Sequence, residues 1–267
     1  MTQFNKMLII GCGNMAGAML AGWLKAGMDP SRFVVFSRSM KSAPGGVVLH
    51  NTPPETSDHD CVMLGFKPHQ LTEFTPDYQR FAGEGVTIFS LLAGIELASL
   101  VSAFPKADAH VRVMPNLAAR VNKSPTILAE TGLSSDADRD AVQKLFGALG
   151  EAHWLADETH YNLATALAGS GPGFVYRFID ALAAAGEELG LEGGMARSLA
   201  LSMVDGAGDL AATSDADPAT LADRVASKGG MTREGLNVLD EGGALKALLT
   251  QTLKAAADRG DELAKLA

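Results

Sequence analysis

A glycine-rich turn between an apolar run and a helical pattern is the feature that most constrains the fold. Residues 7–16 are MLIIGCGNMA, so Gly11, Gly13 and Ala16 match the pattern G-x-G-x-x-A. Gly11 allows a sharp turn, Gly13 leaves room for a pyrophosphate, and the small Ala16 lets the helix pack on the strand. The motif predicts a strand–turn–helix unit that binds a dinucleotide at the helix N-terminus. The alternative is an ordinary strand–helix turn.

The first half of the chain alternates short apolar runs with helical patterns. The runs are rich in β-branched residues, which is typical of a parallel sheet covered on both faces. We expect strands at 6–10, 32–36, 61–66, 85–92, 109–114, 125–130 and 151–155. Helices are expected at 14–26, 95–103 and 135–148. This alternation predicts an α/β fold with a doubly wound parallel sheet.

The strand pattern ends at about residue 158, and alanine-rich helical patterns follow it. We expect helices over 159–168, 172–190, 194–213, 218–226 and 243–265. This shift predicts two domains, a nucleotide-binding domain of residues 1–158 and a helical domain of residues 159–267. The helical domain looks too thin to bury its own helices, so we expect an obligate homodimer through residues 160–267.

The charge and composition of the chain limit the kinds of partner that we expect it to bind. The net charge of −9 gives no general attraction to nucleic acid or to an anionic membrane. No apolar stretch has membrane-spanning length, and the start of the chain lacks a signal-peptide pattern. Cys12 and Cys61 are far apart, and neither the cysteines nor the histidines have metal-ligand spacing. We therefore expect a cytoplasmic protein with a small-molecule substrate and no metal, nucleic acid or membrane partner.

The residues after the second expected strand indicate which dinucleotide binds. An NAD site usually has Asp or Glu there to hold the ribose hydroxyls. This chain instead has FSRSMKS at 36–42, in which Ser37, Arg38 and Ser39 are donors and Arg38 is a cation. A 2′-phosphate needs such a cation, so NADPH is expected in preference to NADH. The alternative is that Arg38 is a solvated loop residue.

Five further segments, in this order, resemble those of pyrroline-5-carboxylate reductases. They are FKPHQL (66–71), SLLAGI (90–95), RVMPNLA (112–118), TALAGSGPGFVY (165–176) and SKGGMTREGLNVLDEGG (227–243). The resemblance covers essentially the whole chain, and the MPN, GSGP and GG-x-T-x-x-G segments are its most specific parts. Met114, Pro115 and Asn116 end an expected strand at the carboxyl edge of the sheet, where ligands bind in open α/β sheets.

The resemblance implies an enzyme that reduces the C=N bond of 1-pyrroline-5-carboxylate to L-proline, the last step of proline biosynthesis, with NADPH or NADH. It also implies an N-terminal Rossmann-type domain and a C-terminal all-helical dimerisation domain, in homodimers that often join into a homodecamer. The cofactor would lie on Gly11, Cys12, Gly13, Asn14, Met15, Ala16, Ser37, Arg38, Asn51, Phe66, Lys67, Pro68, Leu91, Leu92 and Ala93.

The resemblance also implies a substrate loop near the end of the chain. The candidate substrate-binding residues are Lys228, Gly229, Gly230, Met231, Thr232 and Glu158. Tandem glycines expose backbone N–H groups that can hold a carboxylate, and a helix starting near Thr232 would point its positive end at the same anion. The Thr232 hydroxyl, the candidate catalytic group, can hydrogen-bond the ring nitrogen. The alternative is that Thr232 is only an N-cap and the glycines only a turn.

The chain departs from the family pattern at four positions. Lys228 stands where the family usually has Pro, and Met231 stands where it often has Thr. Asn162 replaces the usual Asp, and Phe174 replaces the usual Tyr. We expect these changes to alter substrate affinity rather than the reaction. Other NADPH-dependent imine reductases, β-hydroxyacid dehydrogenases and non-catalytic NADPH sensors remain alternatives. The absence of Lys from 172–190 argues against the dehydrogenases, and a sensor would have no reason to keep GGMT at 229–232.

Overall fold

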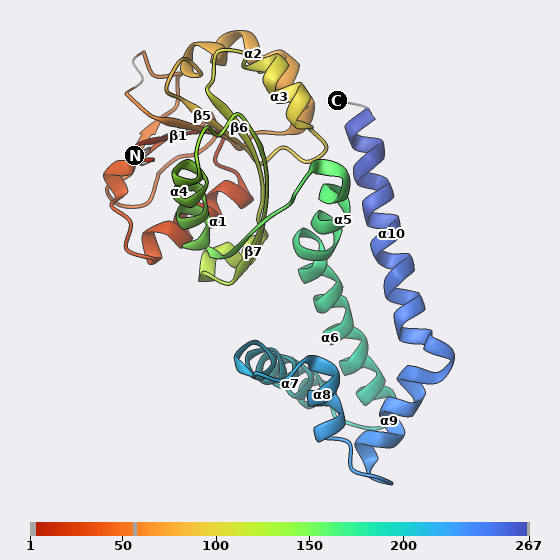
Figure 1. Cartoon of the computed structure of the whole chain (residues 1–267). Helices are drawn as coiled ribbons and strands as arrows, with labels where there is room; N and C mark the ends of the chain where they lie inside the picture. Colours follow the sequence, from red (N-terminus) through yellow and green to blue (C-terminus); the bar gives the residue numbers. More distant parts are fainter. Residues whose placement is uncertain (1–3, 56–57, 266–267) are drawn as a thin grey trace. The chain divides into compact units, whose positions relative to one another are not determined.

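The computed structural model describes residues 4–55 and 58–265, in which one sheet organises the N-terminal part of the chain (Figure 1). Its strand order is β3-β2-β1-β4-β5-β6-β7-β8. The strands are β1 Met7–Ile10, β2 Phe33–Phe36, β3 Val48–His50, β4 Cys61–Leu64, β5 Thr87–Ser90, β6 Ala109–Met114, β7 Ser124–Thr131 and β8 Gly150–Trp154. The first six strands pair in parallel and have the order of a dinucleotide-binding sheet. The predicted α/β fold class is confirmed.

Helices cover both faces of this sheet because alternate strand residues point to opposite sides. On one face, Ile9 packs in a core with Trp23 of α1 (Asn14–Lys25) and Phe146 of α4 (Asp136–Gly147). On the other face, Ile10 packs in a core with α2 (Leu71–Tyr78) and α3 (Leu97–Ala103). The strands are buried on both sides, which explains their nearly continuous apolar sequence.

The pairing of β6 with β7 is antiparallel, so the sheet is not wholly parallel. The connection between these strands runs only from residue 115 to residue 123 and contains the short 3₁₀ helix Leu117–Val121. A parallel crossover needs a dozen or more residues, so the chain turns back instead. β8 then pairs in parallel with β7.

The second half of the chain is helical. A short helix α5 (Tyr161–Ala164) leads into a π-helical turn, Thr165–Gly169. The remaining helices are α6 Gly171–Glu188, α7 Gly193–Thr213, α8 Pro218–Arg224, α9 Met231–Asp240 and α10 Ala244–Lys265. Contacts divide the chain into two compact units, one ending at Ser170 and including α10 from Ala255 onward, the other spanning Gly171–Lys254. The domain boundary expected between residues 158 and 159 stays a prediction.

The helices of the second unit leave much apolar surface uncovered. Within the described chain, α6, α9 and α10 contain no buried residue. Tyr176 on α6, Leu201 on α7 and Val238 on α9 are each more than half exposed. Apolar surface of this extent usually marks an interaction site. None of the described helices is both long and apolar enough to cross a membrane.

Candidate active site

The turn after β1 is packed too closely for side chains. Gly11 has φ +84°, a conformation that favours glycine, and a Cβ there would lie 2.8 Å from the backbone nitrogen of Phe66. A Cβ on Gly65, which follows β4, would lie 2.2 Å from the Gly11 carbonyl oxygen. The two turns at the carboxyl ends of β1 and β4 therefore touch through their backbones. This contact lies at the point where the strand order reverses, the usual ligand site of such sheets.

Gly13, in contrast to Gly11 and Gly65, lies beside open space. Among the described residues, no atom lies within 4 Å of the place where its Cβ would be. Gly13 is the N-cap of α1, and no side chain within the described part of the chain caps that helix. The N–H groups of its first turn can therefore hold a ligand, and they favour an anion. The open space beside Gly13 fits the pyrophosphate role expected from the motif.

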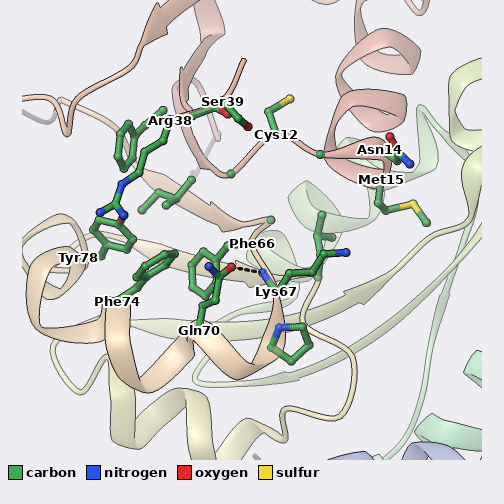
Figure 2. A pocket seen from close by; sticks show the side chains of 18 of the residues that line it. Cys12, Asn14, Met15, Arg38, Ser39, Phe66, Lys67, Gln70, Phe74 and Tyr78 are labelled. Atoms are coloured by element: carbon green, nitrogen blue, oxygen red, sulfur yellow. Dashed lines mark hydrogen bonds between the residues drawn. The ribbon is translucent and has the colours of Figure 1, made fainter. Parts of the chain in front are cut away.

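A cavity of about 790 Å³ lies at the carboxyl ends of these strands (Figure 2). The expected cofactor residues that line it are Gly11, Cys12, Gly13, Asn14, Met15, Ser37, Arg38, Phe66, Lys67, Pro68, Leu91 and Ala93. Ala16 and Leu92 are buried in the two cores instead. Asn51 supports the loop that carries Arg38, because its amide donates to the carbonyl oxygens of Ser37 at 2.7 Å and Met40 at 2.9 Å.

The charge of this cavity is opposite to that of the whole chain. Arg38 and Lys67 line it, and none of the described lining residues is acidic. Burial raises the pKa of the Cys12 thiol, which keeps this group uncharged beside the glycine turn. A thiolate there would repel phosphate. The cavity is thus a local cationic site in an acidic protein, as a phosphorylated ligand requires.

Several lining residues were not expected from the sequence. They are Ile10, Phe36, Gly65, Gln70, Phe74, Tyr78 and Leu117, whereas Ser39, expected as a donor beside Arg38, lines the cavity as well. Phe74 and Tyr78 belong to α2, a helix that was not predicted, although the spacing of Leu71, Phe74 and Tyr78 is a helical signal. Leu117 follows the MPN segment, so this segment leads directly into the cavity wall.

The MPN segment also joins the sheet to the π-helical turn. Asn116 caps the 3₁₀ helix after β6 by accepting from the Ala118 N–H at 2.9 Å. Its side-chain amide donates to the carbonyl oxygen of Ala168 at 2.9 Å. A π-helical turn frees backbone groups from the regular helical pattern, and such turns are frequent at functional sites. Asn116 therefore connects the cavity wall to the GSGP segment.

The loop expected to hold the substrate precedes α9. Gly229 has φ +71°, and Gly230 is the N-cap of the helix. Thr232 thus lies in the first helical turn and is not the N-cap, so the alternative role as a cap is wrong. Among the residues that the structure describes, no side chain caps α9, which leaves its first N–H groups for another partner. Lys228, Met231 and Thr232 are exposed beside them.

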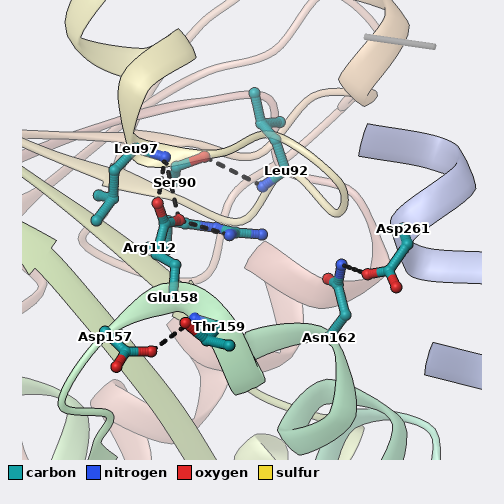
Figure 3. A network of polar contacts seen from close by, with 9 residues as sticks. All are labelled: Ser90, Leu92, Leu97, Arg112, Asp157, Glu158, Thr159, Asn162 and Asp261. Carbon is teal, nitrogen blue, oxygen red and sulfur yellow. Dashed lines mark hydrogen bonds and ion pairs between the residues drawn. The ribbon is translucent and has the colours of Figure 1, made fainter. Parts of the chain in front are cut away.

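Glu158 takes part in a network of the first unit (Figure 3). Its Oε1 accepts from Arg112 Nη1 at 2.6 Å, and both carboxylate oxygens accept from the Leu97 N–H, at 3.1 and 3.2 Å. The Arg112 side chain is buried, and its guanidinium lies 3.6 Å from the ring centre of Tyr161. Glu158 thereby ties the 3₁₀ helix Glu158–His160, which precedes α5, to the start of α3, just after the cofactor segment 91–93. Its contact with substrate stays a prediction.

Comparison with known proteins identifies the family. Residues 158–263 match the model for pyrroline-5-carboxylate reductase dimerisation, and residues 6–94 match that for coenzyme F420-dependent NADP oxidoreductases. The pyrroline-5-carboxylate reductase of Pisum sativum is 32% identical over 260 residues, which cover 95% of this chain and 94% of that protein. This chain belongs to the pyrroline-5-carboxylate reductase family. A Bacillus subtilis pyrroline-5-carboxylate reductase is 30% identical and covers 97% of this chain.

Solved pyrroline-5-carboxylate reductases have the same fold over the full length. The enzyme from Coxiella burnetii superposes with a TM-score of 0.90 and 29% identity, covering 98% of this chain and 99% of its own. The enzyme from Plasmodium falciparum superposes with a TM-score of 0.82 and 23% identity, and its structure contains bound NADP.

One departure from the pyrroline-5-carboxylate reductase pattern has a structural explanation. The Asn162 side chain donates to Asp261 Oδ1 at 2.7 Å, and a Cβ on Gly260 would lie 2.9 Å from Asn162 Cγ (Figure 3). An Asp at position 162, which the family usually has, would place two carboxylates together here. The amide replaces this repulsion with a hydrogen bond. The structure offers no comparable explanation for Phe174.

Proposed function

We propose that this protein reduces 1-pyrroline-5-carboxylate to L-proline with NADPH, in the last step of proline biosynthesis. The observation that carries the proposal is the full-length relationship to pyrroline-5-carboxylate reductases together with a cationic cavity at the reversal of the strand order. Bound NADPH would supply the hydride for the C=N bond. NADH is the weaker alternative, because no acidic residue follows β2 to hold a free ribose.

The cofactor would lie along the wall of the cavity described above. Backbone groups beside Gly13 and the first turn of α1 would hold the pyrophosphate. Ser37, Arg38 and Ser39 would hold the 2′-phosphate, with the guanidinium as the principal contact. Lys67 adds a second positive charge at the cavity wall.

The substrate would bind at the start of α9. The N–H groups that follow Gly229 and Gly230 would hold its carboxylate, helped by the positive end of the helix and by Lys228. The Thr232 hydroxyl would hydrogen-bond the ring nitrogen. Protonation of that nitrogen makes the neighbouring carbon more electrophilic. Met231 and Glu158 would complete the surroundings of the ring.

The protein would work as an obligate homodimer through residues 160–267, with each active site built from both subunits. The uncovered apolar side chains of α6, α7 and α9 support this arrangement. Further assembly to a homodecamer is the expected larger form. We place the enzyme in the cytoplasm, where the free thiols of Cys12 and Cys61 stay reduced.

The direct test is the loss of NADPH absorbance in the presence of 1-pyrroline-5-carboxylate, with L-proline measured as the product. We expect turnover with NADPH and slower turnover with NADH at equal concentration. A six-membered cyclic imine and a β-hydroxyacid with NADP serve as comparison substrates. Tight NADPH binding without any proline formed would instead identify a sensor, and oxidation of the hydroxyacid would identify a dehydrogenase.

A further inference from the structure

Two aromatic rings of α2 lie beside the arginine that we assign to the 2′-phosphate. The Arg38 guanidinium carbon is 5.1 Å from the ring centre of Phe74. The Tyr78 ring is 5.4 Å from that of Phe74, and Figure 2 shows the guanidinium beside both rings. The two aromatic residues are four positions apart on one helix, so they share a face. Arg38 itself is exposed, and these rings are its support within the cavity.

Aromatic side chains of the core pack against both rings and hold them rigidly. Phe74 meets Phe66 edge to face at 5.3 Å, and Tyr78 meets Phe36 in the same way at 5.8 Å. Both rings belong to the core between the sheet and α2, yet both also line the cavity. They therefore form a fixed surface beneath a long, flexible side chain. Attraction of a guanidinium to an aromatic face favours one orientation of that side chain.

The support leaves the charge of Arg38 available. Phe74 carries no charge, and burial raises the pKa of the Tyr78 hydroxyl, with the nearby Arg38 acting in the opposite direction. The hydroxyl is thus neutral at physiological pH and forms no ion pair with the guanidinium. A carboxylate in the same place would hold Arg38 equally well but would compete with a phosphate. Aromatic support fixes the cation without neutralising it.

We propose that Phe74 and Tyr78 are specificity-determining positioning residues that hold Arg38 in place for the 2′-phosphate of NADPH. The inference rests on the proposed function, because it requires NADPH as the cofactor. A free arginine loses rotamer freedom when it binds a phosphate, and an arginine already held on a ring loses less. Discrimination between NADPH and NADH then depends on α2 as well as on the loop after β2.

The test is binding of two nucleotide probes to the full-length protein by titration calorimetry. The probes are 2′,5′-ADP and 5′-AMP, which differ only in the 2′-phosphate. Phe74→Leu should weaken 2′,5′-ADP by about 3- to 10-fold and change 5′-AMP less than twofold. Phe74→Tyr, which keeps the ring, should bind both probes like the wild type. Tyr78→Phe, which also keeps its ring, should bind both probes like the wild type, whereas Tyr78→Leu should weaken 2′,5′-ADP selectively by about 2- to 5-fold.

A second arginine–phenylalanine pair supplies a matched control. Arg80 lies 4.6 Å from the ring centre of Phe81, which is buried in the same core but does not line the cavity. Phe81→Leu should lower the thermal midpoint about as much as Phe74→Leu and leave both probes unchanged. In the enzyme assay, Phe74→Leu should raise the NADPH KM and leave kcat and the NADH KM near their wild-type values.

Equal weakening of both probes by Phe74→Leu would overturn the inference, because the ring would then hold the adenine and not Arg38. Unchanged 2′,5′-ADP binding in both Phe74→Leu and Tyr78→Leu would overturn it as well. Should either leucine variant fail to fold, Phe74→Met decides the matter, because it removes the ring and keeps an apolar side chain of similar volume. A wild type that binds 2′,5′-ADP no more tightly than 5′-AMP would remove the proposed NADPH preference itself, whereas the other outcomes leave it standing.

Discussion

At the scale of single residues, the position of Thr232 in α9 indicates that its hydroxyl serves the reaction and contributes little to the stability of the helix. Gly230 is the N-cap of α9, so the helix does not need the Thr232 hydroxyl as its cap. Thr232 lies in the first turn, beside N–H groups that none of the described side chains caps. A hydroxyl at this place can act on a bound ligand without a large effect on stability.

Thr232→Ala should therefore slow turnover more than it weakens binding. A lost hydrogen bond to a charged partner costs about 1.5–3 kcal/mol, so we expect kcat to fall roughly 10- to 150-fold. Thr232→Ser keeps the hydroxyl and should recover much of that loss, and NADPH affinity should barely change in either variant. Steady-state kinetics with both substrates measures this. Near-wild-type kcat in both variants would remove the proposed role and leave a carboxylate-binding loop.

Arg38 should decide the choice of cofactor. A charge-assisted contact with the 2′-phosphate contributes about 1.5–3 kcal/mol, so Arg38→Ala should raise the NADPH KM by roughly tenfold or more and leave the NADH KM nearly unchanged. Arg80→Ala is the control, because Arg80 also lies over a phenylalanine ring but outside the cavity. A preference of the wild type for NADH, or equal weakening of both cofactors by Arg38→Ala, would contradict the assignment.

At the scale of elements, two glycines at the ends of β1 and β4 have different tasks. Gly65 makes the contact between two strand ends possible, because a Cβ there would lie 2.2 Å from the Gly11 carbonyl oxygen. Gly13 opens the N-terminus of α1 toward the cavity, and its Cβ position is unobstructed. One glycine therefore serves the packing of elements, and the other serves the ligand.

Alanine substitutions should separate these tasks. Gly65→Ala should lower the free energy of unfolding by about 1–3 kcal/mol or more, because backbone atoms must move to admit the methyl group. Gly13→Ala should change it by less than about 1 kcal/mol, since only an uncapped helix end is affected. It should nevertheless weaken NADPH binding at least severalfold by filling the pyrophosphate space. Chemical denaturation and a fluorescence titration measure the two effects. An unaltered NADPH affinity in Gly13→Ala would refute the expected binding position.

At the scale of the whole molecule, the two compact units bury their residues very differently. The sheet and its helices enclose Trp23, Phe33 and Phe146 almost completely. The unit Gly171–Lys254 leaves Leu199, Met203 and other apolar side chains about half exposed or more. Apolar surface of this extent marks an interaction site, and a surface that covers it would stabilise the helical layer. The match to a dimerisation model over residues 158–263 agrees with a second copy as that surface.

We accordingly expect sedimentation to give a homodimer or a larger assembly of the 27.8 kDa chain at assay concentration. Leu199→Glu combined with Met203→Glu places two charges on one stripe of α7 and should produce a monomer with most of its activity lost. Val48→Glu, an equally exposed apolar position on β3, should leave both assembly and activity intact. A fully active wild-type monomer would contradict the proposed shared site.

Local sequence was sufficient for the elements whose signals are local. The strand expected at 109–114 is β6, and the turn after β1 has the positive φ at Gly11 that its motif implies. A buried strand and a tight turn restrict their own residues, so each can be recognised without its neighbours. The MPN, GSGP and GGMT segments lie far apart in the sequence but resemble one family. This resemblance predicted the reaction and most of the residues that line the cavity. It was the order of these segments, and no single one, that indicated the family.

Only the tertiary structure decided the features that depend on distant contacts. β3 has only three residues, and Pro76 inside α2 interrupts the helical signal of its apolar spacing, so pairing and packing on the sheet stabilise both elements. The antiparallel β7 follows from the short connection after β6. The contact of Arg38 with Phe74 and the ion pair of Arg112 with Glu158 join residues that are neighbours only once the strand order is set. The sequence determined the local backbone conformations and the family, and the fold alone brought together the side chains that set charge and position in the site.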